Sequence, residues 1–438
     1  MHHNEPVTEE PYPSTREVRA VEEALEPVAL IEQSGAVVRT GLLMLAAGTA
    51  SYRVKQAMTD VAKSLGIDRA RHHVSFTDIA STSHRGRIFR TEVAENREFA
   101  VNTDRIARLD RFRRDLPERI TAAEVHAALD AIEARGPLYP GWLNAAAAGI
   151  ACAAFAVLNH ALPWEVIVVF IAAALGQFAR RALSHRHFNA FGTVMVAAAV
   201  ASLAYLAGIA LVNTTGEGLE THAAGYISSV LFLLPGFALI TGALDMAKFD
   251  LRAGIERVAF GTMLTMAAGV SVWAVSATAT LDTLPRVDAG LTTIQSVTLW
   301  ALASGVGVAG FALLFNSPWR LAITAGVIGM VANTARMVAV DHGMPVQAAT
   351  AIACFGVGCL AAFAARGGRW PVITLSVPSV LVMIPGVAAH EALVSLNVGD
   401  FTAATAGILQ VTLVVLSIMV GLVAAKLVTD KDWAFGRT

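Results

Sequence analysis

The chain has 438 residues, of which 55% are hydrophobic and only 15% are charged, and its formal net charge is −1 at pH 7. A soluble protein of average composition carries roughly 25% charged residues, so the composition excludes a chain that is soluble along its whole length. The near-zero net charge also gives no electrostatic basis for binding nucleic acid. Charged residues are concentrated in residues 1–141, which hold 19 of the 33 Lys and Arg and 21 of the 34 Asp and Glu.

The N-terminal part is predicted to be a small cytosolic α+β domain over 16–141, preceded by a mobile acidic segment over 1–15. Its first 30 residues lack an apolar core with a basic start, so no secretory signal peptide is predicted. Two alternating stretches, 72–81 and 87–94, predict strands joined by a hairpin turn at 84–86. The sequence predicts helices over 16–31, 35–66, 102–115 and 121–135. The last of these begins with a capping box of Thr121 and Glu124.

The remaining chain is predicted to be an all-α membrane part with ten transmembrane helices. Apolar runs of about 20 residues, enough to cross a bilayer core of roughly 30 Å, recur ten times. We expect them over 142–159, 164–180, 191–212, 224–244, 258–281, 296–315, 319–340, 346–365, 370–394 and 402–428. The first five (within 142–281) and the last five (within 282–438, with a cytosolic tail) are predicted to be two repeats.

The charges of the connecting loops predict the orientation. With the N-terminal domain in the cytoplasm, the inner loops and the tail carry twelve Lys and Arg residues, whereas the outer loops carry only Arg286, plus Arg336 near a helix end. Positive charges gather on the cytoplasmic side of membrane proteins. The chain is therefore expected in the plasma or inner membrane, with both termini cytoplasmic.

Two of the predicted spans are interrupted by the same dipeptide, 150 positions apart. SSVLFLLPGFALITGALDMAKFD contains Pro235-Gly236, and PSVLVMIPGVAAHEALVSLNVGD contains Pro385-Gly386. FAVLNHALPWE, from Phe155, similarly resembles FALLFNSPWRL, from Phe311. Since five spans is an odd number, a second copy must enter from the opposite face, which predicts an inverted repeat. Paired broken helices in two such halves point to a transporter's binding site.

Three blocks carry a family resemblance: GLLMLAAGTASYRVKQAMTDVAKSLGI, the strand pair leading to RIARLDRFRRDL, and LPGFALITGALDMAKFDLRAGIERVAFGT with its weaker second copy. In this order the chain resembles the threonine/serine exporter family over nearly its whole length. The matching fourth-span residues are Pro235, Gly236, Asp245, Asp250, Gly254 and Arg257. The second copy keeps Pro385, Gly386 and Asp400 but has Ser395 opposite Asp245. The resemblance implies efflux of threonine and serine driven by the proton gradient, whereas related split forms are linked to succinate export.

The Pro-Gly breaks are the first candidates for a substrate site. Proline removes a helical hydrogen bond, so a half-helix starting at Gly236 or Gly386 presents free N–H groups and a positive dipole end. An amino-acid carboxylate suits such an end, and the carbonyl groups freed upstream suit an ammonium or cation. The alternative is a plain proline kink whose backbone is satisfied by neighbouring helices.

Charged residues near the breaks are the next candidates. Glu391, six residues past Pro385 in an apolar run, is expected to be buried and to carry a proton or cation, with snorkelling as the alternative. Its neighbour His390 is a weaker candidate, for which an interhelical hydrogen bond is the alternative.

Three further polar residues complete the set of candidates. Asp245 could meet the substrate ammonium or the coupling cation, or simply pair with Lys248 at a solvated helix end. Asn333 and Arg336 share one span, and Arg336 could pair with Glu391, bind a carboxylate or snorkel to the outer face.

The leading hypothesis is thus a secondary exporter of small hydroxy amino acids that uses a proton or sodium ion and no cofactor or metal. No nucleotide-binding loop occurs, and the three cysteines show no metal spacing. A dicarboxylate exporter is the alternative. A ligand-gated sensor, or a membrane hydrolase using His72 and Ser75, remains as a further class. The expected partners are L-threonine or L-serine and the lipid bilayer, and a homo-oligomer is left open.

Overall fold

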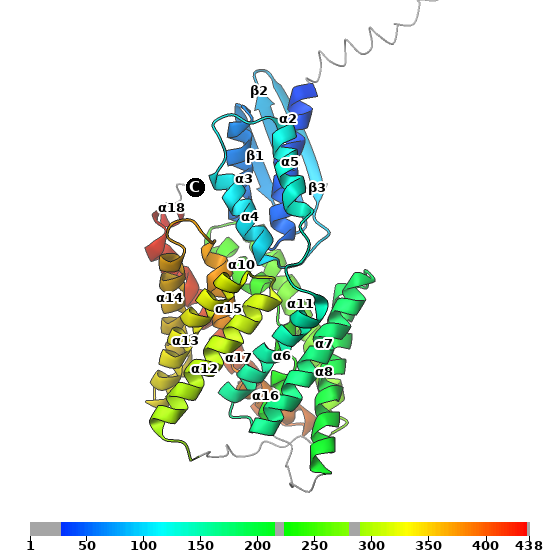
Figure 1. The fold of residues 1–438 in the computed structure, drawn as a ribbon, viewed down its shortest axis with the longest axis vertical. Coiled ribbons are helices and arrows are strands. Elements are labelled where there is room, and N and C mark those ends of the chain that lie inside the picture. The colour runs from blue at the N-terminus through cyan, green and yellow to red at the C-terminus, as the bar shows by residue number, and fades with distance from the viewer. Residues whose placement is uncertain (1–27, 215–222, 280–289, 436–438) are drawn as a thin grey trace, which may run out of the picture.

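A computed structural model of the chain describes residues 28–214, 223–279 and 290–435. An N-terminal domain, residues 28–138, stands on one end of a bundle of helices formed by residues 139–435 (Figure 1). The predicted segment 1–15 and most of the predicted helix 16–31 lie outside the described residues.

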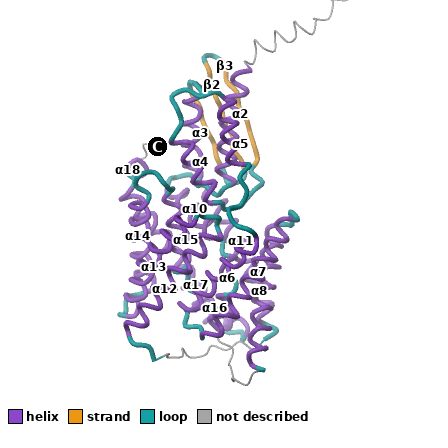
Figure 2. The backbone as a smooth tube through the Cα atoms, viewed as in Figure 1, coloured by secondary structure: helices purple, strands orange, loops and turns teal. Residues whose placement is uncertain are grey.

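The N-terminal domain is a three-stranded antiparallel sheet packed against helices. The strands are β1 (Arg69–Val74), β2 (Asp78–Arg85) and β3 (Ile88–Glu95), in the order β1-β2-β3. The helices are α2 (Val28–Ala46), α3 (Ser51–Ser64), α4 (Thr103–Arg114) and α5 (Ala122–Glu133). Figure 2 shows these helices gathered on one face of the sheet. A core of its own, which includes Leu30, Met58, Ile79 and Leu129, marks the domain as a separate packing unit.

Two predictions for this domain were wrong in detail. The stretch 35–66 forms two helices instead of one, because the chain turns after α2 with Gly48 at a φ of +98°, a conformation that glycine adopts without steric cost. The strand predicted over 72–81 is two strands, since β1 ends at Val74 and β2 begins at Asp78. A strand that alternates on both sides of a short turn looks continuous in sequence.

The hairpin turn and the capping box are confirmed. Gly86, between β2 and β3, has a φ of +59°. The Glu124 amide donates to Thr121 Oγ1 at 3.2 Å, and the Thr121 amide donates back to the Glu124 carboxylate at 2.8 Å. These two contacts satisfy amide groups that the first turn of α5 otherwise leaves free.

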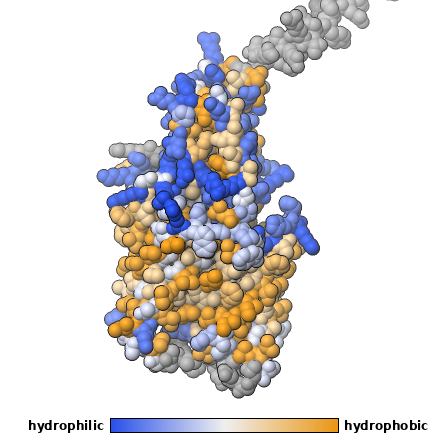
Figure 3. Space-filling model, viewed as in Figure 1, coloured by the Kyte–Doolittle hydropathy of each residue, from blue (hydrophilic) through white to orange (hydrophobic). Residues whose placement is uncertain are grey.

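The bundle is mostly helical, as expected. Its first half contains α6 (Gly141–Leu158), α7 (Pro163–His185), α8 (Ala190–Asn213), α9 (Ala223–Ser228), the 3₁₀ turn η1 (Leu231–Leu233), α10 (Gly236–Ala247) and α11 (Leu251–Ser276). Its second half contains α12 (Thr293–Leu314), α13 (Trp319–Asp341), α14 (Val346–Ala364), α15 (Val372–Leu381), α16 (Gly386–Asn397), α17 (Phe401–Thr429) and α18 (Lys431–Ala434). Figure 3 shows hydrophobic surface across the visible face of the bundle, below the hydrophilic N-terminal domain, as expected for a lipid-facing protein.

Nine helices within the described residues are long and apolar enough to cross a membrane, or up to 11 if each of two bent pairs counts as one span. One of the nine is α2, which packs in the core of the N-terminal domain. The other eight and the two bent pairs lie at the positions of the ten predicted spans. The number of spans that actually cross a bilayer stays a prediction.

The bent pairs coincide with the two Pro-Gly dipeptides. The helix axis turns by 61° between residues 225–233 and 236–247, and by 50° between 372–381 and 386–397. Pro235 and Pro385 each precede the second helix of their pair, with φ values of −81° and −80°. Both prolines therefore break their helices instead of bending a continuous one.

The two halves of the bundle match in their element bounds. α7 and α13 lie 156 positions apart at both ends, and α10 and α16 lie 150 positions apart at both ends. Backbone conformations match as well. Residues with positive φ recur at the same offsets in the pairs His160 and Asn316, His187 and Gly343, and Phe249 and Gly399. Such agreement in local geometry favours a repeated five-helix unit.

The two broken spans also run in opposite directions relative to the N-terminal domain. The first ends there, since Asp250, just after α10, pairs with Lys55 of α3. The second begins there, since Val372 and Tyr52 line the same pocket. The inverted relation between the halves stays a prediction, and this geometry is consistent with it.

Candidate functional site

A cavity of about 1100 Å³ surrounds the second helix break, at the end of the bundle that points away from the N-terminal domain. Its walls come from the C-terminal ends of α6 and α13, the N-terminal ends of α7, α12 and α14, and α16. Among the predicted site residues, Pro385, Gly386, Glu391 and Arg336 line it. The other polar lining residues are Asn159, His160, Thr293, Ser296, Asp341 and Gln410.

Asn333 holds Arg336 in position on the wall of the cavity. The Arg336 Nε donates to Asn333 Oδ1 at 2.8 Å, and Asn333 Nδ2 donates to Ser304 Oγ at 2.8 Å. Asn333 is fully buried between α12 and α13, and its amide is therefore fixed from both sides. This contact uses the Nε of the Arg336 guanidinium. The remaining N–H groups of its planar fork are suited to binding a carboxylate.

Glu391 shares the cavity with Arg336 but does not pair with it. Its side chain is exposed, contrary to the expected burial, because this face of α16 is turned toward the open cavity. Within the described residues no ion pair of 4 Å or less joins Glu391 to Arg336, although both groups face the same space. The predicted ion pair is thus not formed in this conformation.

The start of α16 offers backbone donors to the same cavity. The Gly386 amide donates a hydrogen bond to Ile384 O at 3.0 Å. The free N–H group that the sequence predicted at this glycine is therefore not available. Val387 and Ala388, which follow it, line the cavity as the first turn of α16. First-turn amides and the positive helix end attract a carboxylate.

His390 lies outside this cavity. Its side chain is 2% exposed, and neither ring nitrogen has a hydrogen-bond partner in the described part of the chain. The interhelical hydrogen bond considered from the sequence is therefore absent here. A buried imidazole without a hydrogen-bond partner costs free energy, because its polar nitrogens have lost their contacts with water.

The first broken span has a different surrounding. Asp245 is fully buried, its Oδ2 lies 3.2 Å from Arg257 Nε, and its Oδ1 accepts from the Ser51 amide at 2.8 Å. The solvated pairing with Lys248 was wrong: the lysine instead donates to Trp433 O at 2.9 Å. Asp245 thus caps α3 of the N-terminal domain, which begins at Ser51.

Arg257 completes this contact and was missed as a site residue. It is 1% exposed, its Nη2 donates to Thr49 O at 2.7 Å, and its guanidinium lies 5.1 Å from the centre of the Phe76 ring. From the sequence it was counted among the inner-loop charges and among the residues that match the family motif, without a role in the site. Its place in the block that carries the family resemblance, together with Asp245, was the signal that could have identified it.

Pro235 and Gly236 do not reach the cavity; they lie against the second broken span. A Cβ at Gly236 would lie 2.3 Å from Leu381 Cδ2, so the first break packs closely against the end of α15. Leu381 is four residues before Pro385. The two breaks are therefore neighbours inside the bundle, although only the second one opens onto the cavity.

In the described part of the N-terminal domain, His72 and Ser75, the two residues considered from the sequence for a hydrolase, have separate hydrogen-bond partners. Ser75 Oγ donates to Asp78 Oδ2 at 2.8 Å in the turn after β1, whereas His72 Nδ1 contacts Ser81 Oγ at 2.9 Å. Burial, with a smaller effect of Lys55, lowers the pKa of His72 to about 4. Ser75 and His72 are therefore not paired with each other as a nucleophile and its base.

The family models for this architecture match most of the chain. A threonine/serine exporter model matches residues 36–280, which is more than half of the sequence, and a second one, "Threonine/Serine exporter, ThrE", matches residues 301–428. The chain belongs to the threonine/serine exporter family. It is therefore a membrane exporter by family, and the resemblance seen in the sequence is confirmed.

The relatives of this exporter are named for two different kinds of substrate. "Probable succinate transporter subunit YjjP" of Escherichia coli is 29% identical over 253 residues, 55% of this chain and 94% of the relative. Its namesake in Klebsiella aerogenes is 28% identical over 243 residues, 54% of this chain and 89% of the relative. "Probable threonine/serine exporter" of Mycobacterium tuberculosis is 24% identical over 385 residues, 83% of this chain and 70% of the relative. No solved structure matches the chain.

Proposed function

We propose that this exporter moves small hydroxy amino acids, threonine and serine, out of the cell by proton antiport. The observation that carries the proposal is the charge in the cavity. Its described walls hold one guanidinium, Arg336, and two carboxylates, Asp341 and Glu391. A zwitterion offers a carboxylate for the first and an ammonium for the others, whereas a dianion would face an excess of like charge.

The proposed mechanism places the substrate at the second break. Its carboxylate binds Arg336 and the first turn of α16, and its ammonium and hydroxyl meet the polar side chains opposite. Glu391 exchanges a proton with the medium through the cavity, and its protonation state sets whether the substrate ammonium is held or released. The neutral and charged forms of one carboxylate thereby couple the two fluxes.

Alternating access follows from the arrangement of the broken spans. We propose ten spans in two inverted five-helix copies, with the N-terminal domain and the C-terminal end in the cytoplasm and the chain in the plasma membrane. In the conformation described, the cavity lies at the end of the bundle away from the N-terminal domain, which covers the other end (Figure 1). This is then the releasing state of an exporter, and a rocking motion of the two copies would exchange the open side.

A dicarboxylate exporter is the second candidate, favoured by the relatives that are named for succinate. Inverted membrane vesicles with an acidic lumen separate the two. We expect uptake of labelled threonine that collapses with a protonophore, and no uptake of labelled succinate in a parallel sample. Succinate uptake without threonine uptake would transfer the chain to the dicarboxylate branch. Threonine uptake that persists with the protonophore would contradict the proposed proton coupling.

A further inference from the structure

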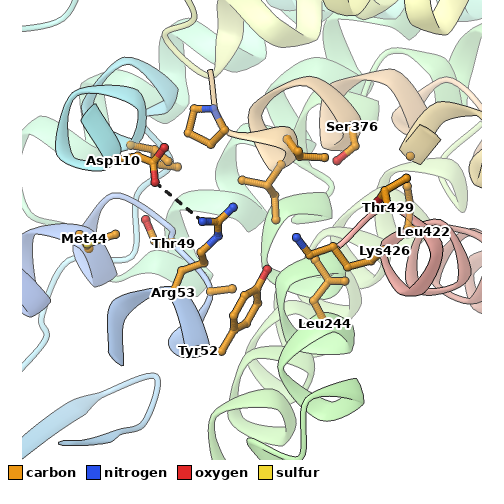
Figure 4. Close-up of a pocket in the computed structure, with 16 residues that line it drawn as sticks. Met44, Thr49, Tyr52, Arg53, Asp110, Leu244, Ser376, Leu422, Lys426 and Thr429 are labelled. Atoms are coloured by element: carbon orange, nitrogen blue, oxygen red, sulfur yellow. Dashed lines mark ion pairs between the residues drawn. The ribbon is translucent and has the colours of Figure 1, made fainter. Parts of the chain in front are cut away.

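A second, smaller pocket lies between the N-terminal domain and the bundle (Figure 4). It has a volume of about 50 Å³, room for about three or four water molecules. Its walls come from α3 and α4 on one side and from α10, α15 and α17 on the other. No lining residue is shared with the large cavity, which begins at the opposite end of α15. The two spaces are therefore separate sites.

Two cations, Arg53 and Lys426, and one carboxylate, Asp110, line the pocket. Arg53 Nη1 lies 3.9 Å from Asp110 Oδ1, its ion-pair partner in Figure 4. Asp110 also contacts Arg113 at 3.5 Å and Arg114 at 3.3 Å, and Arg113 pairs more closely with Asp60 at 2.9 Å, so Asp110 is shared and its contact with Arg53 is long. On the bundle side, the Lys426 ammonium group is turned toward Arg53 and Tyr52 (Figure 4) and forms an ion pair with Asp430 at 2.5 Å. An anion in this space would gain from both cations.

An unsatisfied hydroxyl group also points to a ligand. Thr49 is 4% exposed, lines the pocket, and its Oγ1 has no hydrogen-bond partner in the described part of the chain. A buried hydroxyl without a partner costs about 1–3 kcal/mol, and such groups are rare unless something absent from the structure satisfies them. Tyr52 and Ser376 place further hydroxyl groups around the same space (Figure 4). Hydroxyl donors beside a guanidinium are suited to the two oxygens of a carboxylate.

We propose that this pocket binds the carboxylate group of a small molecule, with Arg53 and Lys426 as its cationic ligands and Thr49 as a hydrogen-bond donor. Because the walls come from both parts of the chain, the site exists only while the N-terminal domain is docked. A bound carboxylate therefore stabilises the docked position of the N-terminal domain, which covers the N-terminal end of α15. The proposal depends on the proposed function only for the choice of probes.

The site can be tested by hydrogen–deuterium exchange of the full-length protein in detergent. The Arg336→Gln background removes the arginine of the large cavity, and L-threonine, succinate and inorganic phosphate serve as probes. We expect one or both carboxylates to slow exchange in segments 49–53 and 371–376. Arg53→Gln should weaken this effect at least tenfold, and Lys426→Gln should weaken it from the other wall. Arg111→Gln, an exposed arginine on α4 outside the pocket, should leave it unchanged.

Three results would overturn the assignment. The first is that neither carboxylate slows exchange. The second is protection that survives both Arg53→Gln and Lys426→Gln. The third is equal protection by phosphate, which would make the pocket a general anion site. Arg53→Lys keeps a cation and provides the folded control if Arg53→Gln unfolds. Because both substrate candidates are probes, a wrong substrate in the proposed function does not remove the test. Vesicle transport by the unchanged protein reports on that function separately.

Discussion

The two broken spans have similar backbones at and after the proline but different surroundings. Pro235 and Pro385 have nearly equal φ values, and the half-helices that follow them have equal lengths. Around the first, a buried ion pair holds the N-terminal domain. Around the second, charged side chains line a cavity and remain apart. The first break therefore contributes to the attachment of the N-terminal domain, and the second is the one that we propose as a binding surface.

The difference lies in a few substitutions at equivalent positions. Ser395 and Gly407 stand where the first copy has Asp245 and Arg257, so the second copy has no ion pair there. Asp400 accepts from the amides of Thr402 and Ala403 at 3.1 and 3.0 Å and so caps its own helix, α17, whereas its counterpart Asp250 pairs with Lys55 of the N-terminal domain. The charges of the first copy are thus engaged by another domain. We infer that the symmetry of the backbone does not extend to function.

Removing one member of the buried pair should have the largest effect. Arg257→Met leaves the Asp245 carboxylate buried beside a neutral side chain, and such single replacements cost about 3–5 kcal/mol. We expect a lower unfolding temperature in detergent and faster proteolysis of the connection after α5. The double variant with Asp245→Asn should recover much of the loss, because no uncompensated charge remains. Ser395→Ala, at the position equivalent to Asp245, is the control and should change stability by less than about 0.5 kcal/mol. A double variant as unstable as the single one would contradict the ion-pair interpretation.

At the second break, the arginine should matter for the substrate rather than for the fold. Arg336→Gln removes the guanidinium that is proposed to bind the substrate carboxylate, a loss of about 2–3 kcal/mol, or roughly 30- to 150-fold in affinity. Competition binding of labelled threonine to the purified protein measures the change. Arg320→Gln, an exposed arginine at the other end of α13, is the matched control and should bind normally. Equal affinity in Arg336→Gln and in the unchanged protein would place the substrate elsewhere.

The proton coupling should depend on Glu391 alone among the cavity carboxylates. In one-for-one antiport, a gradient of one pH unit accumulates substrate about tenfold, which equals about 1.4 kcal/mol. Glu391→Gln cannot exchange the proton, so accumulation in vesicles should no longer follow the pH gradient, while exchange of threonine for threonine continues. Asp341→Asn, in the same cavity, should keep the gradient dependence. If Asp341→Asn loses it and Glu391→Gln keeps it, the proton carrier has been assigned to the wrong residue.

Much of the architecture could be predicted because it depends on local chemistry. The Pro-Gly breaks were found because proline cannot continue a helix, and the apolar runs indicated the helices because a bilayer demands apolar length. The helix predicted over 35–66 failed because Gly48 alone was too weak a signal for a turn inside a helical pattern. The division of the predicted strand 72–81 into β1 and β2 was missed because only a short turn separates the two strands.

The surroundings of the breaks could not be predicted, because they depend on contacts distant in sequence. Asp245 and Ser51 are 194 positions apart, and nothing near Asp245 shows that the start of α3 will meet it. Glu391 was expected to be buried because its neighbours are apolar. Whether one face of α16 meets packed helices or a cavity is decided by α6, α12 and α13. Periodicity shows that a helix is amphipathic or apolar, but not what lies opposite each face.

Replacing the glycine at each break should have the smallest effect on stability, and it compares the two breaks directly. A Cβ at Gly386 would lie 2.7 Å from Phe155 Cε1 and 2.9 Å from its Cζ, atoms of a ring that cannot bend away. At Gly236 the closest atom is the tip of a Leu381 side chain, which can change its rotamer. We therefore expect Gly386→Ala to cost about 1–3 kcal/mol and Gly236→Ala less, in unfolding followed in detergent. Gly356→Ala, in open space on α14, should be neutral or slightly stabilising. A larger loss at Gly236 than at Gly386 would mean that the first break, not the second, is the tighter junction of the bundle.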